Sequence, residues 1–399
     1  MIRQMGKVLA SLGALVCLVG TTHINAATSD GTPVAYVYVA NTPHPGASNY
    51  TPHQVIAFAA DAEGRLTALP GSPFDHDIGP MAVNGLYLMG AKGNQQIINI
   101  YKIASDGHLD YMGETNYAEH NQGRCGAAGQ IFFDHTGHTL YVQEYDIDCA
   151  NSGTASYAAD VETGTLAYLG QTNTGSEYND TNPASFIANN IYAYAAGPGD
   201  CYIYETGAFE RNNNGLLTEL NTIGALTSPE PPSSFRRYVA YLAAADTTNH
   251  VAMTEMPANP PDCLGRPVQL ATYTADSHGN LTTTSTYANM PTTAIVSPYD
   301  LKMAPSGVLL AVGGQEGLQV FHFNGANPVT PYTGLLTRDP INEMFWDNDN
   351  HLYAISQSAN KLHVFTITNS QHTEAPGSPY TITSPDNIIV QPLPLPWTK

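Results

Sequence analysis

The stretch Val34-Ala35-Tyr36-Val37-Tyr38-Val39-Ala40-Asn41 decides the fold of this chain of 399 residues. Its apolar and aromatic residues alternate, which predicts a β-strand, and a second run of this kind follows at residues 54–61. A turn at residues 62–65 leads to the short segment 66–69, and Pro70-Gly71-Ser72-Pro73-Phe74 ends the unit. Three antiparallel strands alone make a marginal sheet, so this unit needs neighbours to be stable.

The same unit recurs along the chain. Its turn, Gly-x-Leu before a short strand, is found again at Gly107, Gly164, Gly215, Gly279 and Gly334. The alternating strand is found at residues 36–41, 86–90, 140–144, 191–195, 251–256, 308–313 and 352–356. No amphipathic helix fits between these runs. Several short strands per repeat, at spacings of roughly forty to sixty residues, are typical of the blades of a β-propeller.

Each blade also needs an inner strand, and the opening unit has none before it. Inner strands are expected at residues 129–134, 184–188, 237–242, 300–304 and 343–347, and the segment 384–390 would supply the missing one. We therefore predict an all-β fold, a seven-bladed β-propeller of four-stranded antiparallel blades. Pairing of the N-terminal blade with a C-terminal strand closes the ring and removes an exposed sheet edge. A two-sheet β-sandwich is the alternative, but it explains neither the seven cycles nor the last segment.

The first residues predict export. Arg3 and Lys7 precede an apolar run from Val8 to Gly20, and small residues follow at Ala26. This pattern is typical of a secretory signal peptide, which we assign to residues 1–26, leaving a single propeller domain at 27–399. A buried first helix is the alternative. The apolar run is too short to span a membrane, so we expect a secreted or periplasmic protein after cleavage near Ala26.

The charge of the chain excludes two classes of partner. The formal net charge is −20, and loss of Arg3 and Lys7 with the signal peptide would make it −22. Such an acidic protein repels nucleic acid and anionic lipid, whereas neutral or cationic ligands remain open. The sequence contains no Gly-x-Ser-x-Gly, phosphate-loop or HExxH motif, and we expect a monomer with no cofactor.

Four cysteines follow the signal peptide. Cys125, Cys149, Cys201 and Cys263 form an even set, which in an exported chain favours two disulfides with three possible pairings. Their places in long loops favour Cys125–Cys149 and Cys201–Cys263, and free buried thiols are the alternative. There is no CxxC pair, so we expect no zinc site. Asp134-His135-Thr136-Gly137-His138 could suggest another metal site, but it falls where a turn is expected and is typical turn chemistry.

Several of these motifs resemble a known family. Tyr-Val-Ala-Asn at residues 38–41, the Gly-Ser-Pro-Phe/Tyr endings at Phe74 and Tyr380, and the Gly-x-Leu turns are similar to those of the lactonase-like seven-bladed propellers. That family includes 6-phosphogluconolactonase, the carboxymuconate cyclases and the Tyr-Val-Thr-Asn repeat proteins. The resemblance implies lactone chemistry where the inner strands converge at one end of the central channel.

The resemblance also suggests site residues. Arg237, in Arg237-Tyr238-Val239-Ala240-Tyr241, and Glu255, in Thr254-Glu255-Met256, match an arginine and a glutamate of the family's active centre. The arginine would stabilise the oxyanion and the glutamate would act as base toward water. The alternative is that Arg237 and Glu255 form an ion pair that stabilises blade five and have no catalytic role. Asn182-Pro183 stands where the family has a histidine.

Four further residues are assigned to ligand binding. His120 and Arg124 lie in the loop Glu119-His120-Asn121-Gln122-Gly123-Arg124-Cys125, which could replace the missing histidine. Asp300 begins an inner strand, and Gln357 with Ser358 fits a recurring pattern of the family. The alternative for residues 119–125 is a solvent-exposed loop without a binding role.

Two functional hypotheses follow from the sequence. In the first, the protein is an exported lactonase-like hydrolase that opens a sugar-type or small carboxylic lactone. In the second, it is a non-catalytic secreted scaffold that binds a glycan, a peptide or a protein surface. Fold-level analogy favours the first hypothesis, and the incomplete set of family residues favours the second.

The disulfide assignment is testable without a structure. Thiol titration of the denatured, unreduced mature protein should find almost no free thiol, because all four remaining cysteines are expected to be paired. The same titration after reduction should find four thiols. Free thiols before reduction would contradict the assignment.

Overall fold

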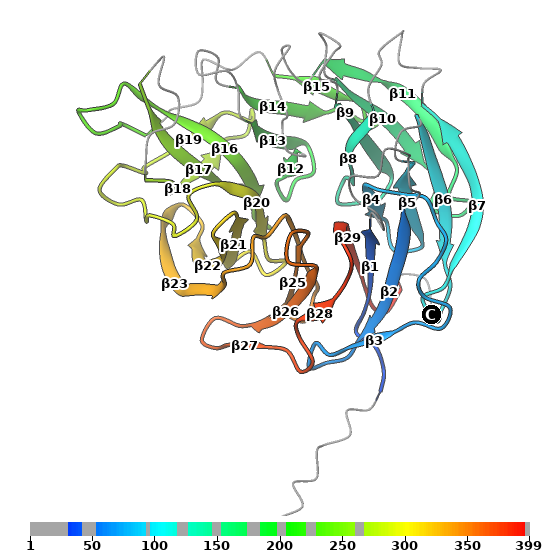
Figure 1. The fold of residues 1–399 in the computed structure, drawn as a ribbon. Helices are drawn as coiled ribbons and strands as arrows, with labels where there is room; N and C mark the ends of the chain where they lie inside the picture. The colour runs from blue at the N-terminus through cyan, green and yellow to red at the C-terminus, as the bar shows by residue number, and fades with distance from the viewer. Residues whose placement is uncertain are drawn as a thin grey trace, which may run out of the picture.

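The computed structural model describes residues 31–41, 53–92, 96–117, 127–145, 153–173, 184–197, 205–220, 229–259 and 267–395. All regular elements in these segments are β-strands, and they form seven separate antiparallel sheets arranged as a ring (Figure 1). The predicted seven-bladed propeller is therefore confirmed, and the two-sheet sandwich is wrong. No helix in the described segments is long and apolar enough to cross a membrane.

In blades two to seven the strands follow the chain in order from the inner strand to the outer one, whereas the inner strand of blade one comes from the C-terminal end of the chain. Blade one is β29 (Pro385–Pro392), β1 (Ala35–Asn41), β2 (Gln54–Ala60) and β3 (Leu66–Ala68). Blade two is β4 (Met81–Val83), β5 (Tyr87–Ala91), β6 (Ile97–Ile103) and β7 (Leu109–Asn116). Blade three is β8 (Ala127–Phe133), β9 (Thr139–Tyr145), β10 (Gly153–Ala159) and β11 (Leu166–Asn173). Blade four is β12 (Ser185–Phe186), β13 (Tyr192–Gly197), β14 (Glu205–Arg211) and β15 (Leu217–Glu219).

The last three blades are as regular. Blade five is β16 (Arg237–Ala245), β17 (His250–Ala258), β18 (Gln269–Ala275) and β19 (Leu281–Thr282). Blade six is β20 (Pro298–Met303), β21 (Leu309–Gly314), β22 (Gly317–Asn324) and β23 (Asn327–Thr337). Blade seven is β24 (Glu343–Trp346), β25 (His351–Ser356), β26 (Lys361–Ile367) and β27 (His372–Glu374), and a further short strand, β28 (Tyr380–Thr381), pairs with β26.

The ring is closed by pairing of the two ends of the chain. β29 is antiparallel to β1, with Val37 opposite Val390 and Tyr38 opposite Ile389. Val37 and Val390 are fully buried and pack in one cluster with side chains of blade seven, such as Tyr353. The blade that opens the sequence is therefore completed by the segment that ends it, as predicted.

Neighbouring blades are joined by tyrosines of the second strand. Their hydroxyls donate hydrogen bonds to the carbonyls of the Gly-x-Leu turn in the next blade: Tyr38 to Gly107, Tyr141 to Gly215 and Tyr194 to Gly279, each at 2.8 Å. Each such bond contributes about 0.5–1.5 kcal/mol net. Gly107 has a φ of +85°, and a Cβ there would lie 2.8 Å from the Tyr36 ring, so this turn requires glycine. The alternating strand and the Gly-x-Leu turn, the two features that repeat in the sequence, are thus hydrogen-bonded to each other between blades.

Two predicted turns are settled by the structure. The segment Asp134–His138 is a turn, because Asp134 Oδ1 accepts the backbone N–H of His138 at 3.1 Å. The Gly-x-Leu turn expected at Gly334 is wrong, since Gly334 lies inside β23. Blade six turns earlier, at Gly325, whose φ of +62° suits the tight hairpin between β22 and β23.

Closure of the ring can be tested by truncation. Removing residues 385–399 deletes β29, exposes the buried edge of β1 and should abolish cooperative thermal unfolding of the mature protein. Truncation after Leu395 keeps β29 and is the control. Circular dichroism melting curves compare the two, and a cooperative transition in the shorter chain would contradict the closing role of β29.

Candidate functional site

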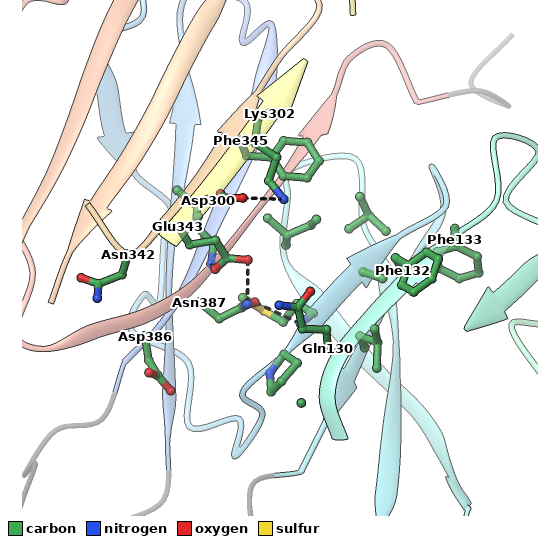
Figure 2. A pocket seen from close by; sticks show the side chains of 18 of the residues that line it. Gln130, Phe132, Phe133, Asp300, Lys302, Asn342, Glu343, Phe345, Asp386 and Asn387 are labelled. Atoms are coloured by element: carbon green, nitrogen blue, oxygen red, sulfur yellow. Dashed lines mark hydrogen bonds and ion pairs between the residues drawn. The ribbon is translucent and has the colours of Figure 1, made fainter. Parts of the chain in front are cut away.

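The inner strands of all seven blades surround a central hollow. Its larger part, a cavity of about 460 Å³, is lined from β4, β8, β20, β24 and β29 (Figure 2). A second part of about 250 Å³ is lined from β8, β12, β16 and β20. The two parts share Phe132, Phe133, Asp300 and Lys302 in their linings, so they adjoin each other. Its size lies in the range of small-molecule sites.

Polar side chains tie the inner strands together around this cavity. An inner strand has unpaired backbone groups on the edge that faces the channel, and these need partners. Asp300 Oδ2 accepts the N–H of Met344 at 2.8 Å, and Glu343 Oε2 accepts that of Ile388 at 2.8 Å. The next contact repeats the arrangement, because Asn387 Oδ1 accepts the N–H of Met81 at 3.0 Å. Four consecutive inner strands, β20, β24, β29 and β4, are linked in this way.

Lys302 adds a cation to the same wall. It lies two residues after Asp300 on β20, so both side chains leave the strand on one side. Lys302 Nζ is 3.4 Å from Asp300 Oδ1, and the two side chains are 31% and 13% exposed. Glu343 lies on the next inner strand, where its Oε1 accepts a hydrogen bond from Asn387 Nδ2 at 3.0 Å. Figure 2 shows these side chains at one wall of the cavity, with Phe132 and Phe133 across from them.

Burial and mutual charge change the acidity of these groups. Burial raises the pKa of Glu343 to about 8, and the nearby Asp300 carboxylate acts in the same direction against the Lys302 ammonium. Burial also raises the pKa of Asp300, although Lys302 opposes it. Burial favours the neutral amine of Lys302, but the charges of Asp300 and Glu343 outweigh this effect. The pKa of Lys302 is therefore raised. At neutral pH the cluster therefore holds a charged lysine beside a glutamate that titrates close to neutrality.

The residues predicted as catalytic lie elsewhere in blade five. Arg237 is the first residue of β16 and pairs with Ala258, whereas Glu255 on β17 pairs with Ala240, three residues along the strand. At about 3.3 Å per residue this separates their backbones by roughly 10 Å. Glu255 is 1% exposed and accepts a hydrogen bond from the Tyr273 hydroxyl, and burial raises its pKa to about 7. Neither residue is among the described residues that line the channel cavity. Their catalytic role stays a prediction.

The other predicted residues have different outcomes. Asp300 lines the channel cavity, and Gln357 lies in the loop after β25, where its Nε2 donates to Asp386 Oδ1 at 3.3 Å. Asp386 lines the same cavity, so Gln357 contacts one of the residues of its lining. His120, Arg124 and the four cysteines Cys125, Cys149, Cys201 and Cys263 lie outside the described residues, and their assigned roles stay predictions.

Sequence reasoning missed Lys302 and Glu343 as site residues. One signal was present: the chain has only 14 lysines and arginines, and Lys302 stands in an expected inner strand, two residues after an aspartate. A charged pair at strand spacing in a segment that faces a channel is a candidate for function. Glu343 carried no comparable signal, because its partners Asn387 and Ile388 come from the far end of the chain.

The chain folds as a seven-bladed propeller whose inner strands line a central cavity. No family model and no curated protein sequence matches the chain. Among solved structures, it is similar to a protein of Lactobacillus plantarum, with a TM-score of 0.62, 10% identity and coverage of 90% of this chain and 99% of that one.

Two further similar structures are of proteins with a named activity. One is the periplasmic gluconolactonase of Pseudomonas aeruginosa, with a TM-score of 0.59, 13% identity and coverage of 91% and 99% of the two chains. The other is a candidate 6-phosphogluconolactonase of Bacteroides uniformis, with a TM-score of 0.56, 12% identity and coverage of 90% and 99%. At these identities the likeness shows the fold, which is that of the lactonase-like propellers.

The raised pKa of Glu343 predicts a pH dependence of stability. Its folded-state pKa, about 8, lies above the value near 4.5 of a free glutamate, so its contribution to stability is present below pH 4.5 and is lost as pH rises through 8. The Glu343→Gln variant should therefore show a flatter fall of the melting temperature between pH 5 and about 9 than the unmodified protein. Glu162→Gln, in an exposed turn, is the control and should leave the slope unchanged. Parallel curves for Glu343→Gln and the unmodified protein would contradict the assignment.

Proposed function

We propose that this protein is an exported lactone hydrolase that binds a small, uncharged lactone in the channel cavity and opens its ring. The observation that carries the proposal is the cluster of Asp300, Lys302 and Glu343 at one wall of that cavity. The gluconolactonase and the candidate 6-phosphogluconolactonase among the structural neighbours support lactones as the substrate class.

The charges of the cavity favour an uncharged substrate. Lys302 is the one cationic side chain among the described residues of the larger cavity, while Asp300, Glu343 and Asp386 supply carboxyl groups there. A phosphorylated lactone would bring two negative charges close to these carboxyls. The strongly acidic chain would also repel it before it reached the channel.

The cluster can perform both halves of the hydrolysis. The Lys302 ammonium donates a hydrogen bond to the lactone carbonyl and stabilises the oxyanion that forms when water attacks. The Glu343 carboxylate takes a proton from that water as its oxygen bonds to the acyl carbon. When the ring C–O bond breaks, Glu343 returns the proton to the leaving alkoxide. The product is the hydroxy acid, and the net change is addition of one water.

The pKa of Glu343 suits this role. A general base works best when its pKa lies near the operating pH, and burial raises that of Glu343 to about 8. Each of its oxygens accepts one hydrogen bond from β29 and keeps a second lone pair for a substrate or a water.

A specific observation favours the alternative, a binding scaffold without catalysis. Asp300 and Glu343 already accept backbone N–H groups of the next inner strands, so bracing the ring is by itself a sufficient reason for both side chains. In that case the cavity would hold a neutral ligand without opening it. Measuring binding and turnover on the same samples separates the two functions.

Turnover of glucono-δ-lactone and γ-butyrolactone by the purified mature protein tests the proposal. Lys302→Met should lower kcat/KM by about 100-fold, the usual loss when one oxyanion donor is removed. In the unmodified protein kcat/KM should rise with pH through a pKa near 8, because the carboxylate form of Glu343 is the active one, and Glu343→Gln should remove this rise.

Variants of the residues suggested by resemblance complete the experiment. Arg237→Ala and Glu255→Gln should retain most of the activity if the channel cluster carries it. If these two variants lose activity while Lys302→Met stays active, the reacting residues lie in blade five and not in the channel cluster. Ligand binding by calorimetry without any turnover would favour the scaffold.

A further inference from the structure

Another hollow lies beside the channel cavity, between blades six and seven. It measures about 530 Å³, and its lining includes Tyr299, Gln315, Asn342, Gln357, Asn360 and Ser384. Tyr299 and Asn342 also line the channel cavity, so the two spaces adjoin. Figure 2, which shows the channel cavity, labels Asn342, one of the residues that line both spaces.

The lining combines one exposed aromatic ring with side-chain amides. Tyr299 is 41% exposed, unusually open for a large aromatic residue, and its hydroxyl donates to Gln315 Oε1 at 2.7 Å. This bond fixes the direction of the ring. No charged side chain is among the described residues that line the hollow. An open aromatic face with neutral hydrogen-bonding groups around it is chemically different from the carboxylate and ammonium cluster in the channel.

Three side-chain amides of the hollow use their oxygens in hydrogen bonds to the protein and leave their NH₂ groups unpaired within the described residues. Asn342 Oδ1 accepts the N–H of Gln357 at 2.9 Å, and Asn360 Oδ1 accepts the N–H of Ser384 at 2.7 Å. The NH₂ groups of Asn342, Asn360 and Gln315 have no hydrogen-bond partner in the described part of the chain. Their positions are therefore fixed by the protein while their donors remain available to a ligand.

Ser384 supplies an independent sign of a ligand. It is 3% exposed, and its Oγ has no hydrogen-bond partner within the described residues, although buried hydroxyls are normally paired. Its φ is +45°, and that of Asn360, which holds it, is +56°. Asparagine adopts this left-handed region readily in turns, but a serine there is strained, and such strain gathers at ligand sites. An unpaired hydroxyl on a strained backbone is explained if a ligand in the hollow completes its hydrogen bonding.

We propose that this hollow is a binding site for a neutral carbohydrate. The apolar face of a pyranose would stack on the Tyr299 ring, and its hydroxyls would accept from the amide groups and bond to Ser384 Oγ. Because no described lining residue is cationic, a neutral sugar fits the site and a uronate or a phosphorylated sugar does not. This site lies outside the lactone-opening cluster and does not depend on turnover there.

Binding of neutral sugars to the mature protein tests the site. Glucose, galactose, N-acetylglucosamine, maltose and cellobiose are titrated at millimolar concentrations by saturation-transfer NMR and calorimetry, with glucuronate as the charged counterpart. At least one neutral sugar should bind, and glucuronate should not. Tyr299→Ala should weaken binding by about tenfold, the loss expected when an aromatic platform is removed. Tyr111→Ala removes a ring that is 56% exposed on the outer strand of blade two and is the matched control.

A second variant separates ligand binding from a structural role. Ser384→Ala removes a hydroxyl that has no protein partner among the described residues, so the melting temperature should stay the same or rise while sugar binding weakens. A lower melting temperature with unchanged binding would overturn the role of Ser384. The site itself is overturned if no neutral sugar binds, if glucuronate binds as well as glucose, or if Tyr299→Ala and Tyr111→Ala bind equally.

Discussion

The contact on which the rest of this structure depends is the hydrogen bond from a tyrosine of one blade to a glycine turn of the next. Tyr38, Tyr141 and Tyr194 make the same bond at the same place in three blade pairs. A blade has two apolar faces and cannot bury either alone, so it is stable only against neighbours. The tyrosine supplies both an apolar ring for that packing and a hydroxyl that donates a hydrogen bond to the next blade. This contact joins three of the seven blade pairs, and apolar packing between neighbouring blades accompanies it around the ring.

The candidate site depends on closure of the same ring. Glu343 on β24 accepts a backbone N–H of the C-terminal strand β29, and Asn387 on β29 accepts one of β4, so both side chains hold β29 in the ring. The groups with the most perturbed acidity in the channel are therefore also structural. Burial at the joint raises the pKa of Glu343, and a glutamate with a pKa near 8 is useful to a hydrolase. In the proposed hydrolase, chemistry and stability would therefore be linked through the Glu343 side chain.

The channel cluster and the hollow beside it differ in kind. The channel holds a lysine among carboxyl groups, whereas the hollow has an open tyrosine ring, amides and a buried serine hydroxyl. They share Tyr299 and Asn342 as a common wall. A saccharide held in the hollow would thus lie next to the cluster to which the proposed function assigns lactone opening.

The sequence by itself determined the architecture, because strands and turns are local and repeat. Alternation at residues 34–41, the glycine turns and the unpaired segment at the C-terminus were sufficient to predict seven blades and their closure. Only the tertiary structure decided which polar side chains share a cavity. Glu255 and Glu343 both lie on strands, yet one is buried beneath Tyr273 in blade five and the other faces the channel with Lys302 nearby. That difference depends on register and on partners more than forty residues away, such as Ile388, which no local pattern records.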